Sequence, residues 1–192
     1  MPRASARGGG SGRTAGPSPS QTTAGPAGGE PVRNALAVRY ADTARTRVLR
    51  LLRRLGKVRV IDPLHLAVVQ LADADRRDKA LAKLRPLLQR GDIDFLTPLL
   101  LDRTTQRHQV LTDEITVRFR RKVSARRLRD LEKEFGVTVA ARNEFVPSQY
   151  TLRVPHPEGL VTLETAKRLD ALKDTVFAAP NFISEHVRSS WW

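Results

Sequence analysis

The sequence predicts an α+β protein built from two tandem βαββαβ units of the ferredoxin-like type, preceded by a disordered N-terminal tail. Residues 36–100 and 115–182 read as two copies of one pattern, in which strand, helix, two strands, helix and strand follow one another. Each copy is therefore one supersecondary unit. Right-handed crossovers place the four strands of a unit in one antiparallel sheet with both helices on one face. The other face is expected to stay open to solvent or to a partner.

The first 33 residues are expected to form the disordered tail. They consist mainly of Gly, Ser, Pro, Ala, Thr and Arg, with almost no large apolar side chain. Such a segment cannot bury enough surface to offset the entropy of ordering. The predicted domain boundaries are 1–33 for the tail, 34–102 for the first unit, 103–112 for a polar linker, 113–187 for the second unit and 188–192 for a C-terminal tail.

In the first unit, alternating apolar residues predict a strand at 35–40, and an Arg-rich segment with apolar residues at helical spacing predicts a helix at 43–55. Pro63 falls between two strands, where a missing donor is tolerated. Pro86 falls inside the second helix, where it costs about 3 kcal/mol and is expected to kink or end the helix near Leu84. The remaining elements are predicted at 57–61, 64–71, 75–90 and 93–101.

The second unit repeats this order. Ile115, Val117 and Phe119 alternate in its first strand, as apolar residues do in the first copy, and Phe119 is assigned to the core. Ser124 and Thr162 are natural N-caps, because their hydroxyls accept from first-turn amides. The first helix of each unit is expected to stop at a glycine, Gly56 or Gly136. The elements are predicted at 114–119, 124–135, 137–142, 149–154, 162–173 and 175–185.

The charge balance predicts an acidic partner. The formal net charge is +14, from 34 Lys and Arg against 20 Asp and Glu. Nucleic acid, an anionic surface or an acidic protein would each satisfy this excess. A solvated helix face is the simpler explanation of the densest basic run. The residues of this possible basic patch are Arg45, Arg47, Arg50, Arg53 and Arg54.

Composition also limits the compartment and the chemistry. The chain has no cysteine, which excludes disulfides, thiol nucleophiles and thiolate metal sites. No apolar run approaches the roughly 20 residues of a membrane span, and the N-terminal arginines are not followed by the apolar segment of a signal peptide. We expect no membrane partner and, by default, a cytoplasmic protein, with secretion left open.

No catalytic, cofactor or metal site emerges from the sequence. Its four histidines, His65, His108, His156 and His186, are scattered and form no metal-ligand pair. There is no Gly-rich phosphate loop and no nucleophile elbow. Ser and Asp are present, but no spacing brings together a nucleophile, a base and an orienting group. We expect a protein that is not an enzyme and needs no cofactor.

A basic βαββαβ unit is also the outline of an RNA-recognition module. Such modules stack bases on aromatic side chains of their central strands. The strand at 64–71 has no aromatic residue, and the matching strand of the second unit offers only Tyr150. Contact with nucleic acid would therefore be of the salt-sensitive backbone type. A basic binding protein that contacts nucleic acid, or a scaffold, is the alternative function.

Four stretches in the second half of the chain are informative through their order and spacing: 111–119, 135–136, 143–150 and 179–182. In these stretches, the segment from Phe95 to Arg188 resembles the propeptide of subtilisin-like serine peptidases, in particular the fervidolysin-type N-terminal prodomain. No single stretch is diagnostic. The first unit fits the family more loosely, as a diverged duplicate.

The resemblance implies an inhibitor or folding chaperone of a subtilisin-like peptidase, acting in cis in a longer precursor or in trans. Such propeptides lay their open sheet face on the peptidase and pass the C-terminal segment through the substrate cleft as an added strand. The peptidase's catalytic Asp, His and Ser motifs are absent. A stand-alone inhibitor, a released propeptide and the front part of an interrupted gene all remain open. The cleft-binding tail would be Ser184, Glu185, His186, Val187, Arg188, Ser189, Ser190, Trp191 and Trp192.

Overall fold

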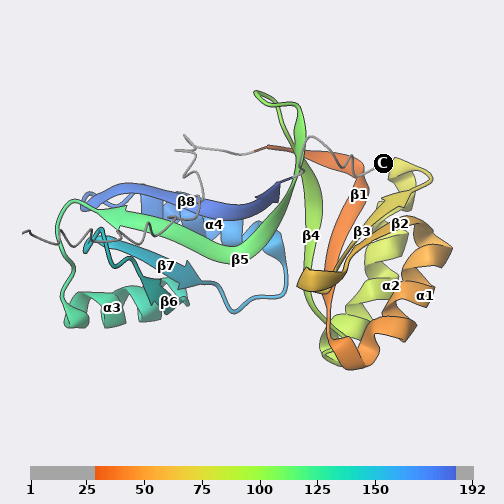
Figure 1. The fold of residues 1–192 in the computed structure, drawn as a ribbon, viewed down its shortest axis with the longest axis horizontal. Coiled ribbons are helices and arrows are strands. Elements are labelled where there is room, and N and C mark those ends of the chain that lie inside the picture. The colour runs from red at the N-terminus through yellow and green to blue at the C-terminus, as the bar shows by residue number, and fades with distance from the viewer. Residues whose placement is uncertain (1–28, 185–192) are drawn as a thin grey trace, which may run out of the picture.

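The structure is a computed structural model that describes residues 29–184 (Figure 1). It confirms the α+β prediction of two βαββαβ units. The first unit contains β1 (Glu30–Tyr40), α1 (Arg45–Leu55), β2 (Gly56–Ile61), β3 (Leu66–Leu71), α2 (Arg77–Gln89) and β4 (Ile93–Asp102). The second contains β5 (Arg107–Phe119), α3 (Ala125–Phe135), β6 (Thr138–Arg142), β7 (Gln149–Arg153), α4 (Gly159–Asp170) and β8 (Thr175–Ser184).

The strands of both units join in one eight-stranded sheet. The order is β2-β3-β1-β4 in the first unit and β6-β7-β5-β8 in the second, with every neighbouring pair antiparallel. The hairpin between β4 and β5 connects them, because Leu99 pairs with Val110 and Asp102 with Arg107. Later residues of β5 pair with β7 instead. The two units therefore lie side by side along the long axis of the molecule (Figure 1).

The segment expected to be a linker holds this hairpin. Residues 103–106 form the turn, and β5 already begins at Arg107. The Asp102 carboxylate accepts hydrogen bonds from the amides of Thr104 at 2.8 Å and Thr105 at 3.2 Å. Hydrogen bonds from the Thr105 and Thr104 amides lower the pKa of Asp102. At the other end of the unit, residues 30–33, expected in the tail, belong to β1.

Each unit has its own core between its sheet and its two helices, as predicted. In the first, Leu36, Val38 and Tyr40 of β1 pack with apolar residues of α1 and α2. In the second, Ile115, Val117 and Phe119 pack with those of α3 and α4. The far face of the first sheet is buried as well, contrary to the expectation of an open face. This third cluster contains Ala35, Ala37, Leu66, Val68, Leu99 and Val110.

Two local predictions at helix ends are confirmed. The Ser124 hydroxyl accepts from the amide of Arg127 at 3.2 Å and caps α3. Gly136 follows the last residue of α3 with φ of 63°, the left-handed conformation that glycine adopts without strain. Gly56 follows α1 but has φ of 175°, so it is extended and opens β2.

Two predictions about helix ends need correction. Thr162 is not the cap of α4: the helix begins at Gly159, and Thr162 lies fully buried inside it. Pro86 does not end α2 near Leu84, because the helix continues to Gln89. The alternative, a kink at Pro86, stays a prediction. Pro86 and Ala82, whose carbonyl loses its helical donor, are both exposed. Water can therefore solvate that carbonyl.

A network of ion pairs links the two units on the far face of the sheet. Arg39 of β1 donates from both terminal nitrogens to the Asp113 carboxylate of β5, at 3.0 and 3.1 Å. Its Nε bonds to Asp94 at 3.1 Å, and its guanidinium lies 5.2 Å from the centre of the Phe95 ring. Arg153 of β7 lies 3.7 Å from Asp113. The bidentate pair fixes β1 against β5.

The Asp113 carboxyl makes the stability of the fold depend on pH in the acid range. Burial would raise its pKa, but the hydrogen bonds and charge of Arg39 outweigh burial and hold the pKa below 3.8. A carboxyl with a lowered folded pKa stabilises the fold above its unfolded pKa, and that stability is lost as pH falls through the folded value.

Asp113→Asn is therefore expected to lower the free energy of unfolding by about 1–2 kcal/mol at neutral pH. The loss should begin to shrink below about pH 4, where the carboxyl of the unfolded parent takes up a proton, and should disappear once the pH falls below the lowered folded pKa. Urea denaturation from neutral pH to about pH 2.5 measures both effects. An acid dependence of equal steepness in the parent and the variant would contradict the assignment.

Candidate functional site

The α4 N-terminus meets β4 of the first unit in a tight seam. The Leu96 amide donates to the Pro157 carbonyl at 2.7 Å, and Leu96 forms an isolated parallel bridge with Glu158. Gly159 is buried against Thr97: a Cβ at this position would lie 2.6 Å from the Thr97 side chain. Only glycine fits so close an approach. The seam holds the start of α4 against β4, where Leu96 and Thr97 are buried.

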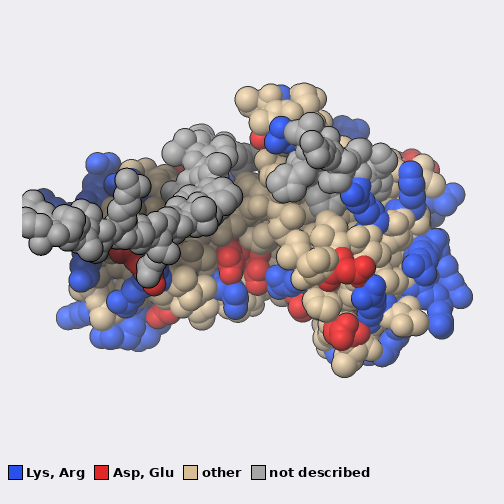
Figure 2. Space-filling model, in the orientation of Figure 1, with Lys and Arg blue, Asp and Glu red and all other residues tan. Residues whose placement is uncertain are grey.

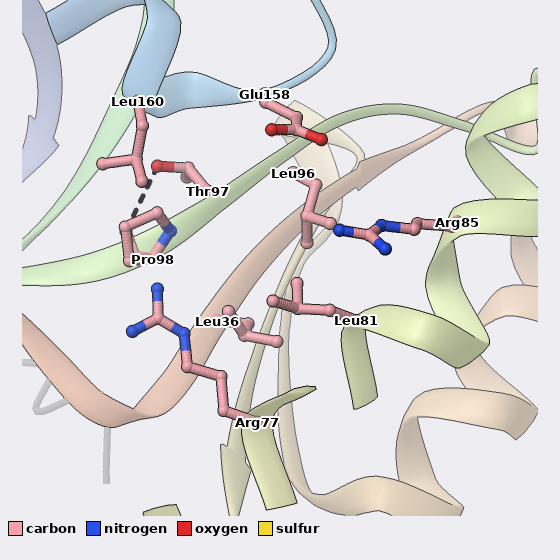
Figure 3. A pocket seen from close by; sticks show the side chains of 9 residues that line it. All are labelled: Leu36, Arg77, Leu81, Arg85, Leu96, Thr97, Pro98, Glu158 and Leu160. Carbon is pink, nitrogen blue, oxygen red and sulfur yellow. Dashed lines mark hydrogen bonds between the residues drawn. The ribbon is translucent and has the colours of Figure 1, made fainter. Parts of the chain in front are cut away.

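A pocket of about 90 Å³ lies beside this seam. Both units line it: α2 and the strands β1 and β4 from the first, and the start of α4 from the second. Figure 3 shows leucine side chains in the middle of the pocket and charged side chains around them. The lining residues are Leu36, Arg77, Leu81, Arg85, Leu96, Thr97, Pro98, Glu158 and Leu160.

The charges around the pocket are of both signs and are not paired with each other. Arg77 and Arg85 lie two turns apart on α2, and Glu158 lies across from them on the second unit (Figure 3). Within residues 29–184, none of the three forms an ion pair. Three uncompensated charges around an apolar floor match a small ligand with charged and apolar parts.

The predicted basic patch is divided by the fold. Arg45 turns to an ion pair with Asp62. Arg47, Arg50 and Arg54 line a groove of about 270 Å³ together with Lys83 of α2 and Arg90, which directly follows α2. Figure 2 shows lysine and arginine gathered over this end of the molecule. Lys83 and Arg90 were not predicted from the sequence, although a spacing of seven places a residue and the end of its helix on one face.

The other sequence candidates do not come together. His65, with φ of 48°, stands edge-on to Tyr40, whereas His108 and His156 lie in the second unit. Residues 29–184 contain no cluster of His, Cys, Asp and Glu that could hold a metal ion. Of the predicted cleft-binding tail, Ser184 ends β8 opposite Gln109. Residues 185–192, including His186 and both tryptophans, lie outside the described residues.

The surface does not favour base stacking. Tyr150, the aromatic residue of the central strand in the second unit, is only 2% exposed and belongs to the core. Its ring packs edge-on against Phe119 at 6.0 Å between ring centres. It therefore offers no open face to a base.

No helix between residues 29 and 184 is both long and apolar enough to cross a membrane.

No family model and no curated protein matches the chain. Solved structures do match it. The acetolactate synthase small subunit from Thermotoga maritima is 14% identical, with 79% of this chain and 93% of that chain covered and a TM-score of 0.29. A putative glycine cleavage system transcriptional repressor is 16% identical, with 79% and 96% covered and a TM-score of 0.26.

These comparisons correct the predicted function. The matching structures are a small subunit of a synthase and a putative transcriptional repressor, and neither is a peptidase propeptide. The prediction of an inhibitor or folding chaperone with a subtilisin-like peptidase as its partner was wrong. The resemblance of Phe95–Arg188 to a prodomain stays a prediction, because no family model matches the chain.

Proposed function

We propose that the protein is a non-catalytic regulatory module that senses a small amino-acid-type zwitterion at the seam between its two units. The observation that supports this function best is the pocket beside Gly159. Its walls come from both units, and its unpaired charges of both signs surround a floor of leucines. No group near the pocket forms a nucleophile and base pair, so binding rather than catalysis is its role.

The chemistry of the lining defines the ligand class. A guanidinium of Arg77 or Arg85 binds a carboxylate through paired N–H donors. Glu158 accepts from an ammonium group on the opposite wall. Leu36, Leu81 and the other apolar lining residues then receive an aliphatic side chain. A zwitterion with a short branched side chain satisfies all three features, whereas a simple amine or a simple acid satisfies only two.

The size of the pocket limits the affinity. A ligand of about eight heavy atoms reaches at best roughly −1.5 kcal/mol per atom, and usually far less. A dissociation constant in the micromolar to millimolar range is therefore expected. Such weak binding suits a sensor, because occupancy then follows changes in the concentration of a metabolite.

Binding at the seam would couple the two units. A ligand that touches α2 on one side and the start of α4 on the other favours the arrangement in which both walls are in place. It therefore stabilises the folded, closed seam by linkage, by about 2.7 kcal/mol at a hundred times its dissociation constant. A surface elsewhere on either unit could respond to this change, and the ligand would then regulate what that surface binds.

The test is a thermal-shift and calorimetry screen of the full chain with short aliphatic amino acids. The matching amines and carboxylic acids serve as comparisons. At least one amino acid is expected to raise Tm by several degrees at saturation. Arg77→Gln/Arg85→Gln and, separately, Glu158→Gln should each weaken binding about tenfold or more.

The matched control is Arg126→Gln/Arg129→Gln on α3, which removes the same charge from two exposed arginines far from the pocket. It should bind like the parent. If no amino acid shifts Tm or releases heat at millimolar concentration, or if the control weakens binding as much as the pocket variants do, the proposed function fails.

A further inference from the structure

A second concave site lies between the two helices of the first unit. Arg47, Arg50 and Arg54 follow each other on α1 at spacings of three and four, so they share one helix face. Lys83 of α2 and Arg90, which directly follows α2, face them. Leu51 and the buried Leu87 form the floor. None of these residues lines the pocket at the seam, so the two sites share a helix but not a surface.

A buried carboxylate lies at one end of the groove, close to two of its arginines. Asp92 is 8% exposed, and its Oδ2 lies 3.4 Å from Arg47 Nη1 and 3.3 Å from Arg90 Nε. The Asp92 backbone is fixed as well, because its amide donates to the Leu87 carbonyl at 2.9 Å and its carbonyl accepts from Ala41 at 3.1 Å. The carboxylate therefore places a negative charge beside two guanidiniums, although its Oδ2 accepts no hydrogen bond from the described residues.

The rest of the groove has no counter-charge among the described residues. Arg50, Arg54 and Lys83 are exposed, and none of them forms an ion pair within residues 29–184. Asp92 thus offsets one of the five positive charges around the groove. Like charges held this close repel one another, and a multiply charged anion would relieve the repulsion.

The length and lining of the groove define the anion. Arg47 and Arg54 are seven residues apart, which is about 10 Å along a helix. A single phosphate reaches only one end of such a row, whereas a chain of three phosphates reaches both. The lining has no aromatic side chain, so a single-stranded nucleic acid would gain no base stacking here.

We infer that the α1–α2 groove binds a short polyphosphate chain, either free or as the phosphate tail of a nucleotide. Arg47 and Arg90, which flank Asp92, bind one end of the chain, and Arg50, Arg54 and Lys83 neutralise the remainder. Guanidiniums suit this task because they bind phosphate oxygens through paired donors. This site needs no contribution from the seam pocket, and it stands if the proposed amino-acid ligand is refuted.

Calorimetry of the full chain with inorganic tripolyphosphate tests the inference. Tripolyphosphate is expected to bind at least about tenfold more tightly than orthophosphate, and its affinity should fall as salt rises. Arg50→Glu/Arg54→Glu should weaken binding by roughly thirtyfold or more, since each reversal replaces an attraction by a repulsion. Lys83→Glu tests the opposite wall with a single exposed substitution, in case the double variant folds poorly.

Arg126→Glu/Arg129→Glu on α3 is the control, because it changes the net charge by the same amount on another exposed helix face. It should keep the parent affinity within about threefold. An equal loss in the control and the groove variants would show a response to net charge alone and would overturn the site. Equal affinities of tripolyphosphate and orthophosphate would overturn the polyphosphate assignment.

Two further arms identify the source of the phosphates. ATP binding as tightly as tripolyphosphate, with adenosine not binding, supports a site that takes the phosphate tail of nucleotides. Tripolyphosphate binding more tightly than ATP supports the free chain. If a short DNA duplex binds more tightly than either and depends on the same arginines, the groove is a nucleic-acid interface and the inference is wrong.

Discussion

Phe119→Asp is expected to unfold the second unit. Phe119 is 1% exposed in the core between the sheet and α3 and α4, where its ring contacts Tyr150. The substitution removes a buried aromatic ring, at a cost of about 3–5 kcal/mol. It also places a carboxylate without a partner in the core, which costs several kcal/mol more. The sum approaches or exceeds the roughly 5–15 kcal/mol that stabilise a whole domain.

Far-UV circular dichroism and thermal melting measure this loss, and two-dimensional NMR shows which unit is affected. Phe145→Asp is the matched control, because Phe145 is 92% exposed and the chemical change is the same. The control should stay within about 0.5 kcal/mol of the parent. A native-like melting curve for Phe119→Asp would show that β5 pairs in a different register.

Gly56→Ala is expected to destabilise the first unit by about 3 kcal/mol or more, although it adds a single methyl group. A Cβ at Gly56 would lie 1.9 Å from the Gln70 carbonyl oxygen and 2.7 Å from its carbon. Both are backbone atoms of β3, the strand with which β2 pairs. No rotamer change relieves this contact, so β2 must move away from β3 and lose ladder hydrogen bonds.

Gly91→Ala separates this clash from ordinary backbone strain. Gly91 has φ of 73° with open space around the missing Cβ, so alanine there costs only about 1–2 kcal/mol. Urea denaturation of both variants gives the comparison. If Gly56→Ala is no more destabilising than Gly91→Ala, the close approach of β2 to β3 is not a constraint on the fold.

The glycines at the ends of α1 and α3 show how far a sequence pattern can be trusted. Both were predicted to stop their helices, and both helices end directly before them. Gly136 is needed for its left-handed conformation, which a local rule predicts. Gly56 is extended and is needed because Gln70 passes close by. The second reason depends on a residue fourteen positions away, and no local pattern contains it.

The same distinction explains the errors in α4 and α2. Thr162 has the side chain of an N-cap, but Leu96 holds Glu158 in an extended conformation and the helix starts directly after it. Pro86 disfavours a helix interior, yet its exposed position lets water satisfy the freed carbonyl. In both cases the surroundings outweigh a local preference of about 1–3 kcal/mol.

The candidate sites show most clearly what could not be predicted from the sequence. The sequence identified the arginines of α1 but not Lys83 and Arg90, which complete the groove from α2 and its C-terminal end. It gave no indication of the seam pocket, because Arg85 and Glu158 are more than seventy positions apart and belong to different units. It also pointed to a peptidase partner that the comparisons do not support.

By itself the sequence determined the repeat, the order of strands and helices in each unit, the cap at Ser124, the left-handed Gly136 and the core positions such as Phe119. These follow from spacing and side-chain type within a few residues of one another. The tertiary structure alone decided that β4 and β5 merge the two sheets, that α4 begins at Gly159 against Thr97, and which charges meet in the pocket and in the groove. Those contacts join residues far apart in the chain, and their free energy exists only once the topology has brought the residues together.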